Sequence, residues 1–216
     1  FNLSNMVVVI TGGIGFLGKQ HADAIASFGG IPVLLDLSQK IIDEFSKELS
    51  EKYNLKIKGF EVDITNENDV ARICSNIIDS FGKVDVLINN AANNPKVDAS
   101  NLLKNTSRLE HFPLDIWNQD IAVGLTGAFL CAKYFGYEMA RAKKGNIINI
   151  SSDLGIIAPN QNLYKQNNVV TSMQNVKPIS YSVVKSGLIG LTRYLATYWA
   201  DRGVRCNAIC PGGVFN

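Results

Sequence analysis

The residue types best suited to chemistry in this 216-residue chain are a serine, a tyrosine and a lysine in its last third. Tyr181 and Lys185 are four positions apart, so on a helix they lie on one face about one turn from each other. A lysine cation there stabilises the phenolate form of the tyrosine, which can then act as a general acid/base. Ser152 ends a strand-like stretch and could donate a hydrogen bond to the same alcohol or carbonyl oxygen. Isolated Tyr/Lys pairs of this spacing are common on helix surfaces, so other motifs in the sequence must show whether this pair has a catalytic role.

A glycine-rich turn near the start of the chain offers a site for a diphosphate. Residues 6–18 read MVVVITGGIGFLG, and the run of Val and Ile predicts a strand buried on both faces. The glycines at 12, 13, 15 and 18 let the backbone turn sharply close to a ligand, and a helix pattern follows at once. A helix N-terminus presents unpaired N–H groups and a partial positive charge, which suit a diphosphate. A purely structural tight turn is the alternative.

An acidic residue follows at the distance expected for a dinucleotide site. Asp36 ends the apolar run 31–36 and lies 18 residues beyond Gly18. A carboxylate there accepts hydrogen bonds from two ribose hydroxyls and repels a 2′-phosphate, which favours NAD over NADP. The alternative is that Asp36 caps the next helix, but Ser38 is better placed for that role.

Strand and helix patterns alternate at short spacing from residue 6 to residue 92, which predicts right-handed crossovers and a parallel sheet. The expected class is therefore α/β, a three-layer doubly wound parallel sheet in a single domain over residues 1–216. The NNAA stretch at 89–92 would lie at the carboxyl end of that sheet, where ligands bind. Further strands are expected at 31–36, 56–62, 84–92 with its loop, 146–151 and 204–210, and helices at 38–53, 114–142 and 181–200.

Two irregular segments, 93–113 and 153–179, interrupt this alternation. Each is longer than ordinary loops and follows the carboxyl end of a strand, so we expect both to overhang the same face of the sheet. The second is rich in Asn and Gln, which suit a hydroxyl-rich ligand, although a solvated loop is an equal alternative. Scattered cations in the two segments suit a phosphate; they are Lys96, Lys104, Arg108, Lys165 and Lys177.

Composition excludes several classes of function. The net charge of +2 and the lack of a Lys/Arg run argue against nucleic acid as a partner. The longest apolar runs have strand length, well below the roughly 20 residues of a membrane-spanning helix. The only histidines, His21 and His111, lack ligand spacing, so no metal site is expected. The four cysteines form no CxxC pair and are expected to be buried, reduced thiols in a cytoplasmic protein.

Taken together, these motifs resemble those of the short-chain dehydrogenase/reductase family over essentially the whole chain. The matching stretches are TGGIGFLG (11–18), Asp36, DIT (63–65), NNAA (89–92), ISSDLG (150–155), YSVVK (181–185) and PGGV (211–214). The resemblance implies a Rossmann fold, a nicotinamide cofactor and catalytic roles for Ser152, Tyr181 and Lys185. It also implies a homodimer or homotetramer formed through the helices at 114–142 and 181–200.

The resemblance further assigns the residues that contact the cofactor. They are Gly12, Gly15, Phe16, Leu17, Asp36, Asp63, Ile64, Asn90, Ala91, Tyr181, Lys185, Pro211, Gly212 and Val214. The segment from residue 162 onward is also similar to members that act in flagellin modification and surface-glycan sugar biosynthesis. A small-molecule substrate of the sugar or sugar-phosphate type is the resulting hypothesis.

The chain departs from the family pattern at three points. Its glycine spacing of 12, 15 and 18 is that of the extended branch, which contains nucleotide-sugar epimerases and dehydratases, whereas NNAA and the length fit the shorter branch. Gly124 stands where the family commonly has an Asn that holds a water in a proton relay. The family chain usually continues past PGGV through a substrate lid and a last strand.

Three readings of the function therefore remain open. The favoured one is an NAD(P)-dependent oxidoreductase that interconverts an alcohol and a ketone. The alternatives are a non-catalytic NAD-binding or regulatory protein, for which Gly124 is the support, and an epimerase or dehydratase that retains its NAD.

Overall fold

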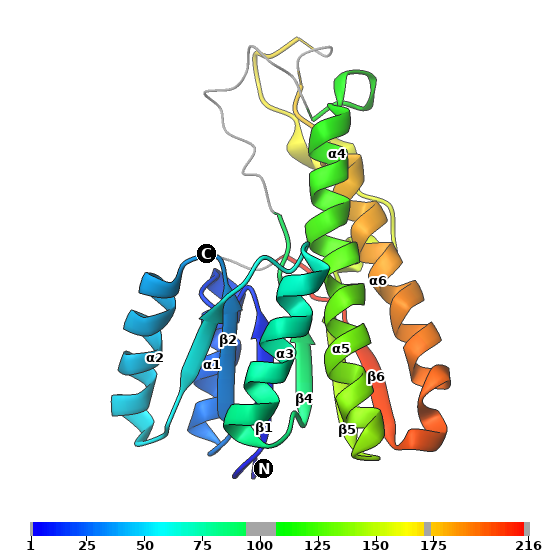
Figure 1. The fold of residues 1–216 in the computed structure, drawn as a ribbon. Coiled ribbons are helices and arrows are strands. Elements are labelled where there is room, and N and C mark those ends of the chain that lie inside the picture. The colour runs from blue at the N-terminus through cyan, green and yellow to red at the C-terminus, as the bar shows by residue number, and fades with distance from the viewer. Residues whose placement is uncertain (1, 94–106, 171–173, 214–216) are drawn as a thin grey trace.

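The computed structural model describes residues 2–93, 107–170 and 174–213, and these form a six-stranded parallel sheet between two layers of helices (Figure 1). The strand order is β3-β2-β1-β4-β5-β6, so the chain first builds outward from β1 and then reverses at β4. This reversal is the doubly wound topology expected from the sequence, and it leaves a crevice beyond the carboxyl ends of β1 and β4. The strands are β1 (Val7–Thr11), β2 (Ile31–Asp36), β3 (Lys58–Glu61), β4 (Val86–Asn89), β5 (Gly145–Ile150) and β6 (Val204–Ile209).

Each face of the sheet carries its own hydrophobic core. On one face α1 (Phe16–Ser27) and α2 (Gln39–Tyr53) cover Val8, Ile10 and Leu34. On the other face the covering helices are α3 (Glu67–Phe81), α5 (Gly127–Arg141) and α6 (Ile179–Tyr198). Alternate residues of β1 point to opposite faces, and both sets are buried, which explains why the strand is apolar throughout.

The long helix expected at 114–142 is divided into α4 (Leu114–Ile121), a π-helical turn (Ala122–Thr126) and α5. Its two glycines, Gly124 and Gly127, lie at close packing contacts. A Cβ at Gly124 would lie 2.5 Å from Cγ1 of Val184, and one at Gly127 would lie 2.7 Å from Cδ1 of Ile64. The glycines therefore allow α6 and the loop after β3 to approach the helix.

The ends of the elements agree with the sequence in most places. Asn66 caps α3, with its Oδ1 accepting hydrogen bonds from the N–H groups of Asn68 and Asp69, and Gly82 ends that helix at φ +75°. Ser38 stands at the N-cap of α2, but its side chain makes no capping hydrogen bond, so that expectation was wrong. The strand predicted at 31–36 has the bounds of β2, whereas the other predicted strands and the helix at 181–200 differ from the observed elements by one to three residues at an end.

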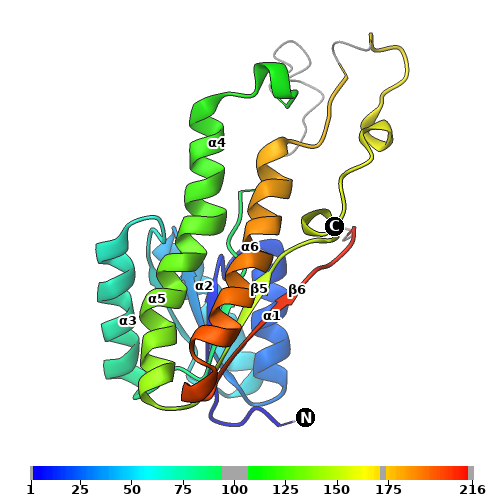
Figure 2. The same cartoon turned by 90° about the vertical axis from the view of Figure 1, so that its right-hand side faces the viewer.

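The segment between β5 and α6 rises above the carboxyl ends of the strands, as expected (Figure 2). Gln174 is buried and organises it: its Nε2 donates to the carbonyls of Gln166 and Val169, and its Oε1 accepts from the N–H of Gln166. The N–H of Val176 donates to Oγ of Ser107 and so ties the segment to the chain before α4. At least this glutamine therefore serves the fold of the segment rather than a ligand.

Candidate active site

A cavity of about 410 Å³ lies at the carboxyl ends of β1, β2 and β4 and reaches α6. It brings together every predicted cofactor residue that the structure describes; Val214 lies outside the described residues. Those lining residues are Gly12, Gly15, Phe16, Leu17, Asp36, Asp63, Ile64, Asn90, Ala91, Tyr181, Lys185, Pro211 and Gly212. Residues separated by up to 200 positions in sequence thus meet at the point where the strand order reverses.

Gly12, in the turn between β1 and α1, and Gly18, in the first turn of α1, lie where a side chain would meet backbone atoms. Gly12 has φ +64°, and a Cβ there would lie 3.0 Å from Cα of Ala91. A Cβ at Gly18 would lie 2.0 Å from the carbonyl oxygen of Gly12. Asn90 then fastens the turn, since its Nδ2 donates to the carbonyls of Thr11 and Gly12 at 3.0 and 3.1 Å. The result is a fixed backbone cradle at the start of α1, which is the arrangement that binds a diphosphate.

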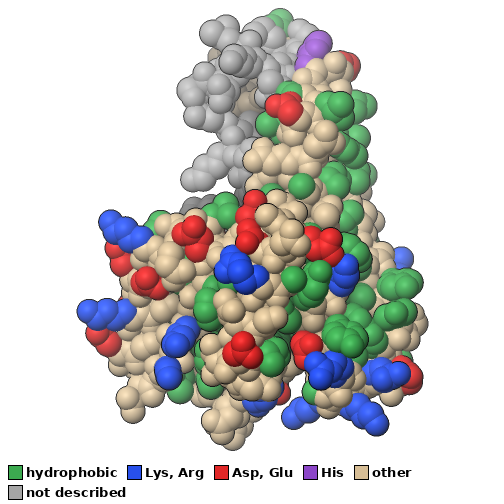
Figure 3. Space-filling view, in the orientation of Figure 1, with side chains coloured by type: hydrophobic (Ala, Val, Ile, Leu, Met, Phe, Trp, Pro, Cys, Tyr) green, Lys and Arg blue, Asp and Glu red, His purple; other side chains and the backbone are tan. Residues whose placement is uncertain are grey.

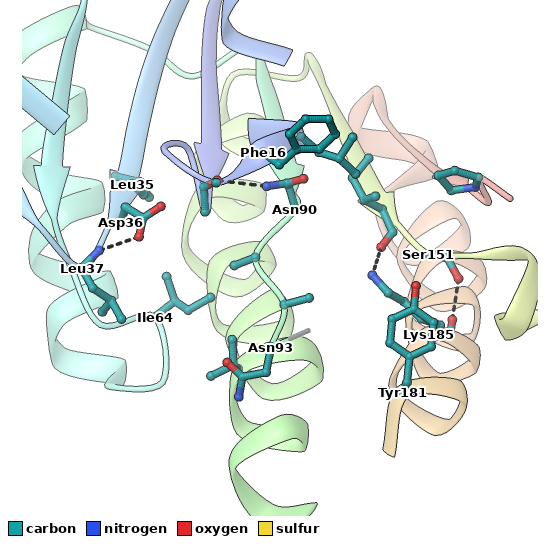
Figure 4. Close-up of a pocket in the computed structure, with 18 of the residues that line it drawn as sticks. Phe16, Leu35, Asp36, Leu37, Ile64, Asn90, Asn93, Ser151, Tyr181 and Lys185 are labelled. Atoms are coloured by element: carbon teal, nitrogen blue, oxygen red, sulfur yellow. Dashed lines mark hydrogen bonds between the residues drawn. The ribbon is translucent and has the colours of Figure 1, made fainter. Parts of the chain in front are cut away.

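Asp36 joins the end of β2 to the same turn, and Figure 4 shows its carboxylate beside Leu37. Its Oδ2 accepts a hydrogen bond from the N–H of Ile14 at 3.1 Å, and its Oδ1 accepts one from the N–H of Leu37 at 2.8 Å. A carboxylate has about four acceptor sites, so two remain for hydroxyl groups of a ligand. The residue therefore orders the turn and still fits the ribose-binding role expected of it.

Lys185 and Tyr181 face the cavity from α6 (Figure 4). Lys185 is 5% exposed, its Nζ donates to the carbonyl of Ile150 at 2.7 Å, and Nζ lies 5.7 Å from the centroid of the Tyr181 ring. Burial, with a contribution from the charge of Lys177, lowers the pKa of Lys185 to about 8. This lysine is therefore a buried cation that can gain or lose its proton near neutral pH.

The two serines after β5 have different surroundings. Ser152 is buried, its Oγ donates to Oδ1 of Asp153 at 2.7 Å, and it is not among the residues that line the 410 Å³ cavity. Ser151 does line the cavity, and its Oγ donates to the carbonyl of Lys185 at 2.7 Å. For Ser152 to donate to a substrate, its hydroxyl must exchange Asp153 for the substrate oxygen.

Several residues at the site were not predicted from sequence. Most are neighbours of predicted ones, namely Leu35, Leu37, Val62, Ala92, Asn93, Ile150 and Ser151. Their proximity in sequence was a usable signal. Val123 comes from the π-helical turn, and Lys177 lies with its Nζ 3.8 Å from the centroid of the Tyr181 ring. No sequence spacing indicates those two contacts.

The glycine cradle, the carboxylate at the end of β2 and the Tyr/Lys pair define a dinucleotide-binding enzyme site of the Rossmann type. Comparison with known proteins agrees: the family model described as "Enoyl-(Acyl carrier protein) reductase" matches residues 13–215. The chain therefore belongs to this family of short-chain dehydrogenases/reductases, which bind NAD(P) and act on CH–OH groups.

Individual relatives differ in the substrates that their names give. The NADP-dependent mannitol dehydrogenase of Alternaria alternata is 31% identical over 98% of this chain and 71% of its own length. The 3beta-hydroxysteroid dehydrogenase 2 of Eggerthella lenta is 28% identical over 97% of this chain and 71% of its own. A crystal structure of NAD+-bound xylitol dehydrogenase shares the fold with a TM-score of 0.83 at 24% identity, covering 100% of this chain and 74% of that one.

The four cysteines differ in how far they are buried. Cys74, Cys131 and Cys206 are buried, whereas Cys210 is only partly so, which corrects the expectation of four buried thiols. Burial raises the pKa of Cys74 and Cys131 to about 12.

Within the described part of the chain, no helix has the length and apolar character needed to cross a membrane.

Proposed function

We propose that this protein is an NAD-dependent oxidoreductase that interconverts an alcohol and a ketone on a polar, hydroxylated substrate such as a sugar or sugar phosphate. One observation carries the proposal: Tyr181 and Lys185 line the same cavity as the glycine cradle and Asp36. A proton-transfer group and a dinucleotide cradle in one cavity are the two parts that such a reaction needs.

When bound, the nicotinamide supplies the hydride chemistry. Tyr181 gives a proton to the substrate oxygen during reduction and takes it back during oxidation. Lys185 holds a positive charge close to that tyrosine and favours its phenolate form. Its hydrogen bond to the carbonyl of Ile150 fixes the ammonium against β5. Ser152 would donate a hydrogen bond to the same substrate oxygen and so orient it.

Asp36 supports NAD rather than NADP as the cofactor. A 2′-phosphate beside this carboxylate would place like charges together, and the residue that follows, Leu37, offers no compensating cation. The name of the mannitol relative gives NADP, so the relatives do not make the choice and Asp36 carries it.

A polar substrate is supported by the segment above the cavity. Residues 153–170 and 174–179 present several exposed amides, including Asn162 and Asn167. The polyol in the name of one relative agrees with this, whereas the steroid in the name of another would require an apolar pocket. The proposed setting is carbohydrate biosynthesis in the cytoplasm, where free thiols persist.

We also propose that the protein forms a homodimer or homotetramer through α5 and α6. Phe129 and Tyr137 on α5, and Tyr194 and Tyr198 on α6, are each at least 48% exposed. They border a hollow of about 880 Å³. Figure 3 shows hydrophobic side chains on the side of the molecule where these helices lie. Exposed large apolar side chains gathered on one face in this way are typical of a protein interface.

The alternatives are weaker. Gly124 was the support for a protein without turnover, but its packing against Val184 gives it a structural reason. An epimerase or dehydratase would keep its NAD bound throughout purification, while the proposed enzyme would exchange it. Assay of the nucleotide released when the purified protein is denatured distinguishes these two.

The decisive experiment follows reduced nicotinamide: NAD or NADP is supplied with polyols, sugars, sugar phosphates and hydroxysteroids, and NADH or NADPH with apolar ketones. We expect NAD-dependent turnover of polar substrates that Tyr181→Phe abolishes. Activity confined to apolar substrates would refute the substrate class, and turnover retained by Tyr181→Phe would refute the mechanism.

A further inference from the structure

A second lysine lies against the face of the proposed acid/base. Nζ of Lys177 is 3.8 Å from the centroid of the Tyr181 ring, closer than the 5.7 Å of Lys185. The backbone N–H of Lys177 donates to Oε1 of Gln161 at 2.9 Å, which anchors this position to the segment above the cavity. Tyr181 is thus flanked by two cations, one from its own helix and one from the residues that lead into it.

Lys177 is a half-buried cation without an ion-pair partner. The ion pairs formed among the described residues do not include it. Asp153 is the carboxylate that acts on it electrostatically, but Oδ1 of Asp153 already accepts hydrogen bonds from Oγ of Ser152 and the N–H of Leu154. Burial lowers the pKa of Lys177, which reflects the cost of holding a charge there. An anion bound beside Lys177 would offset this cost.

The space around Lys177 limits where such an anion can bind. The cavity that it shares with Tyr181 and Lys185 has about 20 Å³, room for roughly one water. A second cavity lined by Lys177, of about 360 Å³, is large enough for an oxyanion. Ser182 lines that cavity too, and its Oγ is buried without a hydrogen-bond partner among the described residues. A lysine and an unpaired hydroxyl are suitable donors to an oxyanion.

From this arrangement we infer that Lys177 binds an oxyanion group of the substrate, a phosphate or a carboxylate, in the cavity of about 360 Å³, away from the carbon that Tyr181 serves. The inference rests on the proposed function and narrows its substrate class from polar molecules to anionic ones. Lys177 is therefore a specificity-determining residue, which lines this cavity and also contacts the ring of Tyr181.

The test compares Lys177→Gln with the wild type on matched probes: neutral hexoses, hexose 6-phosphates and hexuronates. We expect the wild type to prefer one anionic class by at least about tenfold in kcat/KM. Lys177→Gln should remove that preference mainly through KM, which should rise about tenfold for the preferred anionic class. Lys177→Arg should retain most of it. Comparison of the hexose 6-phosphates with the hexuronates identifies whether the bound oxyanion is a phosphate or a carboxylate.

Lys165→Gln is the matched control, because Lys165 is an exposed lysine of the same segment. Equal losses on neutral and anionic probes through kcat would mean that Lys177 acts on Tyr181 alone, and this would overturn the inference. Turnover of neutral sugars without any anionic preference would also overturn it, while leaving the proposed function intact.

If none of the probes is turned over, a binding experiment tests the inference instead. Inorganic phosphate, glucuronate and glucose 6-phosphate are titrated by calorimetry into the protein loaded with NADH. Binding of one of them that Lys177→Gln weakens about tenfold and Lys165→Gln does not would support the inference although the proposed reaction had failed. The absence of Lys177-dependent binding to all three would refute it.

Discussion

The ammonium of Lys185 donates a 2.7 Å hydrogen bond to the carbonyl of Ile150, the last residue of β5, and so ties α6 to the strand beside the cavity. Because this ammonium is buried, it destabilises the fold while it positions a charge next to Tyr181. Buried charges with shifted pKa values of this kind are common at active sites.

The pH dependence of stability tests this cost. Burial and the nearby Lys177 charge lower the pKa of Lys185 from 10.5 to about 8, so the unfolded chain binds this proton more tightly. The penalty is full below pH 8 and is relieved as the pH rises from 8 towards 10.5. The free energy of unfolding of the wild type relative to Lys185→Met should therefore rise over that window, by up to about 3 kcal/mol. Urea unfolding without cofactor at both ends of the window measures it.

The control for this comparison is Lys144→Met, which alters an exposed lysine. The rise over this pH window should be larger for Lys185→Met than for this variant. A pH-independent difference for Lys185→Met as well would mean that Lys185 titrates alike in the folded and unfolded chain.

Gly124 is required for packing. A Cβ there would lie 2.5 Å from Cγ1 of Val184, so Gly124→Ala should lower the free energy of unfolding by about 1–3 kcal/mol. Adding Val184→Ala should recover part of that loss. Gly190→Ala is the control: it lies in α6 with nothing within 4 Å of the added Cβ, and should raise stability by about 0.5–1 kcal/mol. Chemical denaturation gives all four values, and a Gly124→Ala cost unchanged by Val184→Ala would contradict the contact.

The adjacent serines should separate structure from catalysis. Ser151→Ala removes a buried hydrogen bond to the carbonyl of Lys185 and should lower the free energy of unfolding by about 1–3 kcal/mol. Ser152→Ala should instead lower kcat about 100-fold, since it removes a donor to the substrate oxygen. Steady-state kinetics measure the loss of kcat in each variant, and thermal unfolding measures the loss of stability. The reverse pattern would make Ser151 the substrate donor.

Asp36 should determine the choice of cofactor. Asp36→Ser removes the carboxylate that accepts from the N–H groups of Ile14 and Leu37 and that repels a 2′-phosphate. We expect the ratio of NADP to NAD in kcat/KM to rise at least about tenfold. Fluorescence titration with NADH and NADPH provides the same comparison without a substrate. An unchanged ratio would remove Asp36 as the determinant.

The apolar face of α5 and α6 should control assembly. Tyr194 is 61% exposed and stacks on Tyr198 with ring centroids 5.4 Å apart. Tyr194→Glu should disrupt an oligomer formed there, because it places a charge in an apolar contact. Ile41→Glu, at an exposed apolar position on α2, should have no effect. Light scattering after size exclusion reports the mass, and a wild-type monomer would refute the proposal.

The sequence by itself determined the sheet and most of the cofactor cavity. Buried parallel strands read as continuous apolar runs, and each turn that contacts the cavity follows such a run directly, so Gly12, Asp36 and Asn90 could be located from local patterns. The glycines also located the turn after β1, because the backbone at Gly12 has a positive φ and leaves little room for a Cβ.

Tertiary structure alone decided what depends on contacts between distant segments. The position of Lys177 over Tyr181 depends on how the segment after β5 folds back. Gln174 directs that fold by side-chain hydrogen bonds to the backbone of Gln166 and Val169. The packing of Gly124 against Val184 joins two helices whose sequences show no sign of the contact. Such contacts depend on packing in three dimensions, which periodicity along the chain does not encode.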